Sequence, residues 1–237
     1  MEGIAPIETL TKADVEGLLK RYVGKRYENG GIDPTLRFTS FDFCYTRFRR
    51  FVYTGKTTSI ASPANLQENC MHLGFYLASW GMYRPSSKIL SKSARGLAPI
   101  LDLLASLDPA LWELDIEGYS SGSLSQLAAV MEDLKTKLQT EVEVTPTDTL
   151  CTKILLGTLG CTPAFDVYFK AGSDLHSPSK TSFLRLQEFA EKHSGILRSQ
   201  VASCVNFDDG SPTDIPYPTA RLLDMVFYQR GLEWLAK

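Results

Sequence analysis

Apolar residues recur every three to four positions along nearly the whole chain, which is the spacing of one face of an α-helix. The pattern is clearest at Leu124, Leu127, Met131, Leu134 and Leu138, with charged residues on the opposite side. The alternation of apolar and polar residues that is typical of strands is almost absent. We therefore expect an all-α fold of about ten short-to-medium helices, arranged as an orthogonal multi-helix globule.

Capping residues indicate where these helices begin and end. Thr11 with Asp14 predicts the start of a first helix over about 12–27, and Gly55 predicts the end of a second. Ser62-Pro63 predicts the start of a third helix, which continues to about Tyr83.

Later helices are expected over 148–159 and 219–236. Between them, Thr162-Pro163 predicts a helix that continues through Lys170, with Gly172 as its terminator.

The chain length of 237 residues and its 43% hydrophobic content suit one globular domain, residues 1–237, with its own core. The segment 140–149 connects an acidic helix to an apolar one and contains Pro146. We therefore expect a lobe boundary near 140–149, with two lobes sharing one core.

Several classes of protein are disfavoured by composition. No window holds 18 consecutive apolar residues and no signal peptide is visible, so we expect a cytoplasmic protein with no membrane partner. The five cysteines are widely spaced and form no CxxC motif, which predicts reduced, buried thiols, no metal site and no cofactor.

The charge balance bears on nucleic acid as a partner. The chain has 25 basic and 27 acidic residues and a pI near 6.0, which disfavours binding to a polyanion. Residues 1–105 carry 14 basic and 9 acidic side chains and could present a basic face, but residues 106–150 carry 2 basic and 9 acidic. The alternative, which we favour, is that these oppositely charged parts attract each other within one fold. Arginines alternate with aromatic residues over 42–51, but helical spacing places Arg47 and Arg50 on a solvated face.

An uncharged stretch around residues 69–83 predicts a central helix with a polar face. Arg84 and Ser86 follow it directly, and an arginine beside the start of the next helix favours an anion site. The alternative is a buried hydrogen-bond network with an ordinary serine cap. The candidate ligand-binding residues are His72, Tyr76, Tyr83, Arg84 and Ser86.

A second candidate site lies in the segment TKILLGTLGCTPAFDVYFKAG, residues 152–172, where an apolar helix leads into a turn and then to Asp166. These residues resemble the helix-hairpin-helix superfamily of DNA base-excision glycosylases. The resemblance implies that Asp166 is the catalytic carboxylate that assists loss of a flipped base, and that in some members a lysine attacks the sugar carbon.

Parts of that family's pattern are missing. Residues 139–152 contain no glycine, so the expected LPGxG hairpin is absent, and Lys153 lies on the wrong side of the turn to be placed as the lysine. The simpler alternative is that Asp166 only caps its own helix. The segments FYLASWGMYRPSS and GTLGCTPAFDVYF also resemble microbial proteins to which no activity is attached.

Three functional hypotheses follow. The first is a protein that binds a small anionic ligand, nucleotide- or nucleobase-like, in a pocket lined by segment 69–87. The second is a glycosylase-like enzyme that cleaves an N-glycosidic bond with Asp166. The third is a structural or protein-interaction module without an active site. We expect Arg84→Ala to abolish binding under the first hypothesis, and Asp166→Asn to abolish activity under the second.

Overall fold

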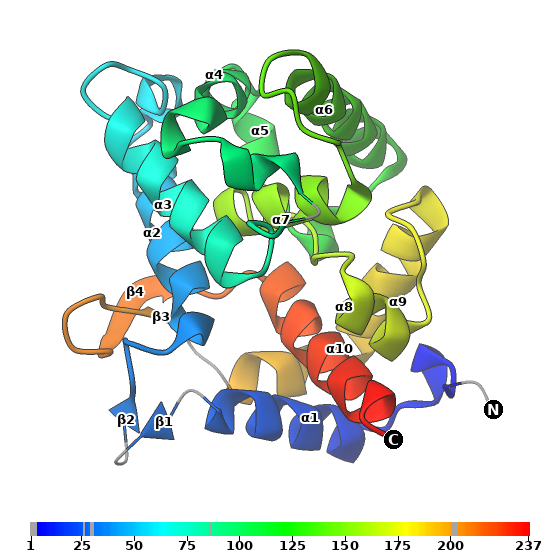
Figure 1. Cartoon of the computed structure of the whole chain (residues 1–237). Coiled ribbons are helices and arrows are strands. Elements are labelled where there is room, and N and C mark those ends of the chain that lie inside the picture. Colours follow the sequence, from blue (N-terminus) through cyan, green and yellow to red (C-terminus); the bar gives the residue numbers. More distant parts are fainter. Residues whose placement is uncertain (1–3, 26, 29–30, 86, 201–202) are drawn as a thin grey trace.

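The computed structural model describes residues 4–25, 27–28, 31–85, 87–200 and 203–237. This part of the chain is built from ten α-helices, as expected from the apolar periodicity (Figure 1). The α-helices are α1 (Lys12–Gly24), α2 (Ser40–Tyr53), α3 (Leu66–Ser79), α4 (Ala98–Ala105), α5 (Pro109–Trp112), α6 (Ser121–Thr140), α7 (Asp148–Thr158), α8 (Val167–Ser173), α9 (Lys180–Gln200) and α10 (Thr219–Leu235).

Short elements connect these helices. Two antiparallel hairpins are formed by β1 (Tyr27–Glu28) with β2 (Gly31–Ile32), and by β3 (Ser203–Val205) with β4 (Pro212–Pro216). The 3-10 turns are η1 (Ile7–Thr9), η2 (Arg37–Thr39), η3 (Thr57–Ser59), η4 (Lys88–Ser91), η5 (Ala94–Leu97) and η6 (Ile116–Gly118).

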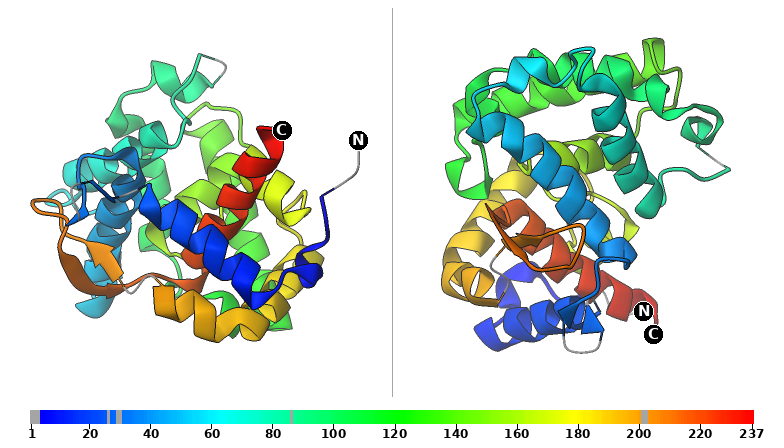
Figure 2. Two further views of the ribbon diagram at one scale, coloured as in Figure 1. Left: turned by 90° about the horizontal axis from the view of Figure 1, so that it is seen from below. Right: turned by 90° about the vertical axis from the view of Figure 1, so that its left-hand side faces the viewer.

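The helices form two groups in space. Helices α2 to α7 occupy the upper part of Figure 1, where α7 packs against α2, α3 and α6. Helix α1 lies with the C-terminal helices α9 and α10, and α10 also packs along α8 (Figure 2). Buried apolar side chains from all ten helices belong to one connected core.

The core includes all five cysteines, which are buried and free, as the sequence predicted. Burial raises the pKa of Cys151 and of Cys161 to about 12, so both thiols stay protonated at neutral pH. Among the described residues, no helix is long and apolar enough to cross a membrane.

A distant aspartate caps the start of α10. The backbone N–H groups of Thr219 and Ala220 donate to the carboxylate of Asp115, at 2.6 and 3.0 Å. Asp115 thereby supplies the acceptor that the residue before the helix, Pro218, lacks. Burial raises the pKa of Asp115 to about 6, although these backbone donors favour its ionised form.

Helix α3 is shorter than the sequence pattern suggested, beginning at Leu66 and ending at Ser79. Gly81 adopts a left-handed conformation, with φ of +74°, and the N–H of Met82 donates to the carbonyl of Leu77. This glycine-based stop turns the chain away from the helix. The expected continuation to Tyr83 is therefore wrong.

Helix α8 also differs from its prediction. It begins at Val167 rather than at Thr162-Pro163, because Asp166 is the residue that caps it. Gly172 lies inside the helix, and the left-handed residue that ends it is Asp174, with φ of +58°.

Gly172 instead allows α8 and α10 to cross in backbone contact with Gly231. A Cβ atom built on Gly172 would lie 1.9 Å from the carbonyl oxygen of Phe227, and one on Gly231 would lie 1.8 Å from that of Tyr168. Neither position has room for a side chain. This close crossing brings the N-terminal end of α8 beside α10.

Candidate functional site

The turn after α3 supplies one wall of the site. Trp80 is only 8% exposed, and its indole N–H donates to Ser40 Oγ at 3.1 Å. Its ring packs edge-on against Phe38 and Tyr228, with centroids 5.9 and 5.8 Å away. These contacts fix the indole, and with it the backbone carbonyl of Trp80.

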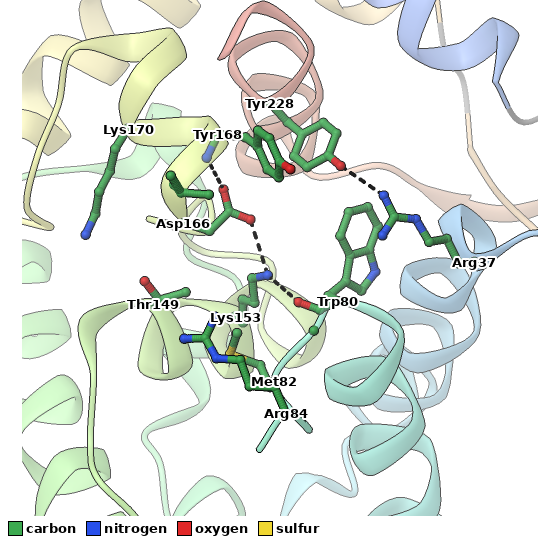
Figure 3. A pocket seen from close by; sticks show the side chains of 12 residues that line it. Arg37, Trp80, Met82, Arg84, Thr149, Lys153, Asp166, Tyr168, Lys170 and Tyr228 are labelled. Atoms are coloured by element: carbon green, nitrogen blue, oxygen red, sulfur yellow. Dashed lines mark hydrogen bonds and ion pairs between the residues drawn. The ribbon is translucent and has the colours of Figure 1, made fainter. Parts of the chain in front are cut away.

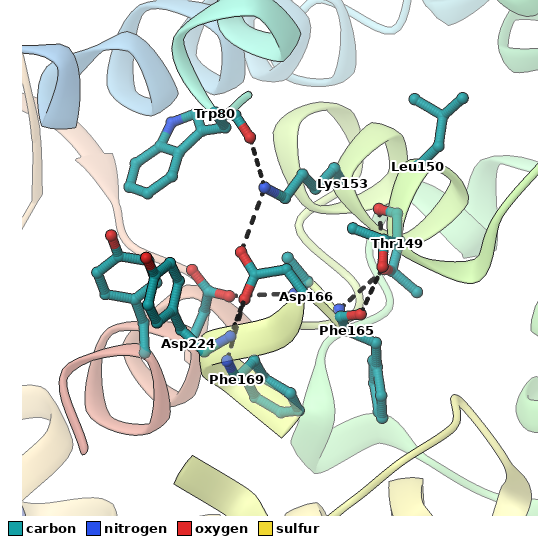
Figure 4. A network of polar contacts seen from close by, with 12 residues as sticks. Trp80, Thr149, Leu150, Lys153, Phe165, Asp166, Phe169 and Asp224 are labelled. Atoms are coloured by element: carbon teal, nitrogen blue, oxygen red, sulfur yellow. Dashed lines mark hydrogen bonds and ion pairs between the residues drawn. The ribbon is translucent and has the colours of Figure 1, made fainter. Parts of the chain in front are cut away.

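A non-helical segment in which the chain reverses direction supplies the opposite wall of the site. Residues 159–165 leave α7 and run back along it, with Gly160 in a left-handed conformation. The Thr149 hydroxyl donates to the carbonyl of Phe165 at 2.8 Å, and the N–H of Phe165 donates to Thr152 Oγ1 at 2.9 Å. The next residue, Asp166, is thereby held beside the first half of α7 (Figure 4).

Asp166 has two roles at this point. Its Oδ1 accepts hydrogen bonds from the N–H groups of Tyr168 and Phe169, both at 3.0 Å, which caps α8. Its Oδ2 lies 3.2 Å from Lys153 Nζ. Lys153 is 4% exposed and also donates to the carbonyl of Trp80 at 2.7 Å. Because an ammonium group has three N–H bonds, one remains for another acceptor.

A buried charge network lies behind this pair. Asp224 accepts a hydrogen bond from the N–H of Ala164 at 3.1 Å and lies 2.5 Å from the guanidinium of Arg221. The Arg221 guanidinium also lies 5.1 Å from the Trp80 ring centroid. Burial raises the pKa of Asp224 to about 6, while Arg221 favours its ionised form. The network therefore supports both walls from inside the core.

The crossing of α8 and α10 adds two aromatic rings. The centroids of Tyr168 and Tyr228 lie 5.0 Å apart at an interplanar angle of 60°. The Tyr228 hydroxyl accepts a hydrogen bond from Arg37 Nη2 at 3.0 Å, and the Arg37 guanidinium lies 5.5 Å from the Trp80 centroid. Arg37 thus connects the Tyr228 ring of α10 with the Trp80 ring in the turn after α3.

These walls enclose a cavity of about 610 Å³ (Figure 3). This volume lies within the range of small-molecule sites, roughly 300–1,000 Å³. One carboxylate, Asp166, lines the cavity together with four basic side chains, Arg37, Arg84, Lys153 and Lys170. The other lining residues are Trp80, Gly81, Met82, Thr149, Val167, Tyr168 and Tyr228. The cavity is therefore positively charged and partly aromatic.

The structure brings together two of the residues that the sequence singled out, because Arg84 and Asp166 line the same cavity. It does not bring the others there. Tyr76 is 2% exposed and its ring lies against Gly157 in the core. Tyr83 is half-buried beside Gly74, because α3 ends before it. Ser86 lies outside the described residues.

His72 lines a separate hollow of about 250 Å³ with Arg47 and Glu68. Its Nε2 lies 3.8 Å from a carboxylate oxygen of Glu68. Burial and the charge of Arg47 lower the pKa of His72, so it is largely neutral at pH 7. The polar face expected on the central helix is therefore divided between the core and this second hollow.

Lys153 is the main residue that the sequence interpretation missed. The chain order places it before the turn, but the return of residues 159–165 brings Asp166 back to it. The chain order that set Lys153 aside did not indicate that its Nζ lies 3.2 Å from Asp166 Oδ2. A lysine within an otherwise apolar helix was the available signal, because such a group is rarely buried without a partner.

Trp80, Tyr168, Tyr228, Arg37 and Lys170 were also not predicted to share a site. Tyr168 and Lys170 follow Asp166 within four residues, but no local pattern relates them to Trp80, Tyr228 and Arg37, which lie far away in the sequence. In the described part of the chain, no three His, Cys, Asp or Glu side chains gather in a way that could hold a metal ion.

Comparisons of the chain with models of known protein families, with curated proteins and with solved structures found no match.

Proposed function

We propose that the cavity between Trp80 and Asp166 binds a small anionic ligand that carries a planar ring, of the nucleotide or nucleobase class. The observation that carries this proposal is the cavity lining, which contains four basic side chains and three aromatic rings but only one carboxylate. Basic side chains favour an anion, and aromatic faces favour a heterocyclic ring.

The preorganisation of the lining supports the same function. Lys153 is buried and retains one N–H for an acceptor, while the Trp80 ring is fixed by its hydrogen bond to Ser40. A site whose groups are already ordered loses little conformational entropy when a ligand binds.

A thermal-shift screen against nucleobases, nucleosides, nucleotides and short DNA tests the proposal. A ligand at one hundred times its Kd adds about 2.7 kcal/mol of stability. For a chain of this length we expect this to raise Tm by about 5–10 °C. Tyr168→Leu removes a ring from the lining and should weaken the shift, whereas Tyr53→Leu, at a tyrosine outside the cavity, should leave it unchanged. No shift with any compound would contradict the proposal.

A second candidate function is cleavage of an N-glycosidic bond. It is favoured by one observation, which is that Asp166 lines the cavity and pairs with Lys153. In such a reaction the bond between the sugar carbon and the base nitrogen breaks, and water adds at the carbon. The Asp166 carboxylate would stabilise the positive charge that develops on the sugar.

Release of free base, measured by chromatography from bound nucleotides and from damaged DNA, tests this second candidate. Asp166→Asn keeps an oxygen that can cap α8 but removes the charge, so it should abolish release while the protein remains folded. Release at the wild-type rate by this variant would exclude Asp166 as the catalytic carboxylate.

A further inference from the structure

The four basic side chains of the cavity differ in what they already bind. Arg37 donates to the Tyr228 hydroxyl, and Lys153 contacts both Asp166 and the carbonyl of Trp80. In contrast, the side chains of Arg84 and Lys170 make no hydrogen bond or ion pair with another residue that the structure describes. Arg84 is exposed and Lys170 is half-buried, so both can bind a ligand without breaking an existing contact.

The two groups of side chains also lie at different ends of the cavity. Figure 3 shows Arg84 and Lys170 on one side of the Lys153–Asp166 pair, and Trp80, Tyr228 and Arg37 on the other. The cavity therefore has one end with two cations that pair with no described residue and one end with aromatic rings. The Asp166 carboxylate between them can accept a hydrogen bond from a hydroxyl group.

We infer that the ligand is a nucleoside monophosphate, with its phosphate between Arg84 and Lys170, its sugar near Asp166 and its base against Tyr168, the least buried of the three aromatic rings that line the cavity. The inference rests on the binding function proposed above and names its ligand class.

Charge favours a phosphomonoester over a carboxylate at the cationic end. A phosphomonoester carries about −1.5 to −2 charges at pH 7, which matches two cations, whereas a carboxylate neutralises one. The guanidinium of Arg84 can bind two phosphate oxygens at once, and Lys170 supplies a compact point charge.

Size and net charge favour a free nucleotide over a nucleic acid. The cavity of about 610 Å³ suits one small molecule. The chain as a whole carries a net charge of −2, which opposes binding to a long polyanion.

Calorimetric titration of the wild-type protein with four ribonucleosides, their 5′-monophosphates and a short 5′-phosphorylated oligonucleotide tests the inference. We expect the best-bound monophosphate to bind about tenfold more tightly than its nucleoside, because charged hydrogen bonds to the phosphate contribute that much or more. Arg84→Gln and Lys170→Gln should each reduce this ratio, because each should weaken binding of the monophosphate more than binding of the nucleoside. Arg50→Gln, at an exposed arginine outside the cavity, is the matched control.

The possible outcomes separate this inference from the proposed function. If no nucleoside or nucleotide binds, the proposed function and the inference both fail. If nucleosides and monophosphates bind equally, binding of the planar ring stands, but the preference for an anion and the phosphate site are both wrong. If monophosphates bind more tightly and the two variants weaken both ligands alike, the proposed function stands and the phosphate site is wrong. If a 5′-phosphorylated oligonucleotide binds more tightly than any mononucleotide, the phosphate belongs to a nucleic-acid end and the assignment to a free nucleotide is overturned.

Discussion

The buried pair of Lys153 and Asp166 allows a quantitative test of how the site is held together. Their charged atoms lie 3.2 Å apart, and their side chains are 5% and 12% exposed. At an effective dielectric constant of 20, this distance gives an attraction of about 5 kcal/mol, of which desolvation offsets a part. Removing one partner leaves the other charge buried and uncompensated, so Lys153→Met and Asp166→Asn should each cost about 3 kcal/mol.

The double variant distinguishes the ion pair from other causes of instability. Asp166→Asn retains an acceptor for the N–H groups of Tyr168 and Phe169, so its main loss is the charge. With both residues replaced, no unpaired charge remains. The double variant should therefore be more stable than the sum of the single effects predicts, by at least about 2 kcal/mol.

Urea unfolding followed by circular dichroism at pH 7 measures the four free energies of this cycle. The same cycle on the exposed pair Glu16 and Lys20, which lie 2.6 Å apart, is the control and should give a coupling of about 0.5 kcal/mol or less. A coupling of that small size for Lys153 and Asp166 would refute the reasoning, because it would mean that burial does not strengthen the pair.

Three further predictions concern stability. Gly231→Ala should destabilise the protein by about 3 kcal/mol in urea unfolding, because the new Cβ overlaps the α8 backbone. Gly195→Ala in α9, where the Cβ meets open space, is the control and should stabilise the protein by about 0.5–1 kcal/mol. Similar effects of the two substitutions would contradict the close crossing of α8 and α10. The folded-state pKa of Asp115, about 6, lies above the ordinary value, so its ionisation costs stability as the pH rises from about 4 to 6. The side chain introduced by Asp115→Asn cannot ionise, so the stability of this variant relative to wild type should increase by up to about 3 kcal/mol between pH 4 and pH 7. A difference in the free energy of unfolding that does not change with pH would contradict the raised pKa. Burial lowers the pKa of His193, whose ring nitrogens have no described partner, so its protonation below about pH 6 favours unfolding. When Tm is measured from pH 7 to pH 5, the wild-type protein should therefore lose more stability than His193→Phe. Parallel curves for the two proteins would show that His193 does not take up a proton on unfolding.

The helices could be predicted where their signals are local. Thr11 and Asp14 form a capping box at the expected start of α1, Gly55 ends α2, and the apolar stripe of α6 is buried. Each of these features depends on residues that lie within one helix or at its end. The end of α3 was missed although its signal was also local, because the uncharged pattern beyond Gly81 outweighed the glycine.

The site could be predicted only in part, because most of it depends on contacts between distant segments. Arg84 and Asp166 were identified from their own neighbours in the sequence. The pairing of Asp166 with Lys153 depends on the return of residues 159–165, and the contact of Arg37 with Tyr228 joins residues 191 positions apart. No hydrophobic periodicity or capping motif in the sequence predicts such contacts, so they are seen only in the packed structure.

The crossing of α8 and α10 has a consequence for recognising relatives of this chain. Because each glycine faces the backbone of the other helix, a larger residue at one position cannot be offset by a smaller one at the other. Chains that share this architecture should therefore retain both Gly172 and Gly231, with an aspartate six positions before the first. This pattern of three residues is a fingerprint for the cavity wall, and it should persist where the surrounding helical sequence has diverged.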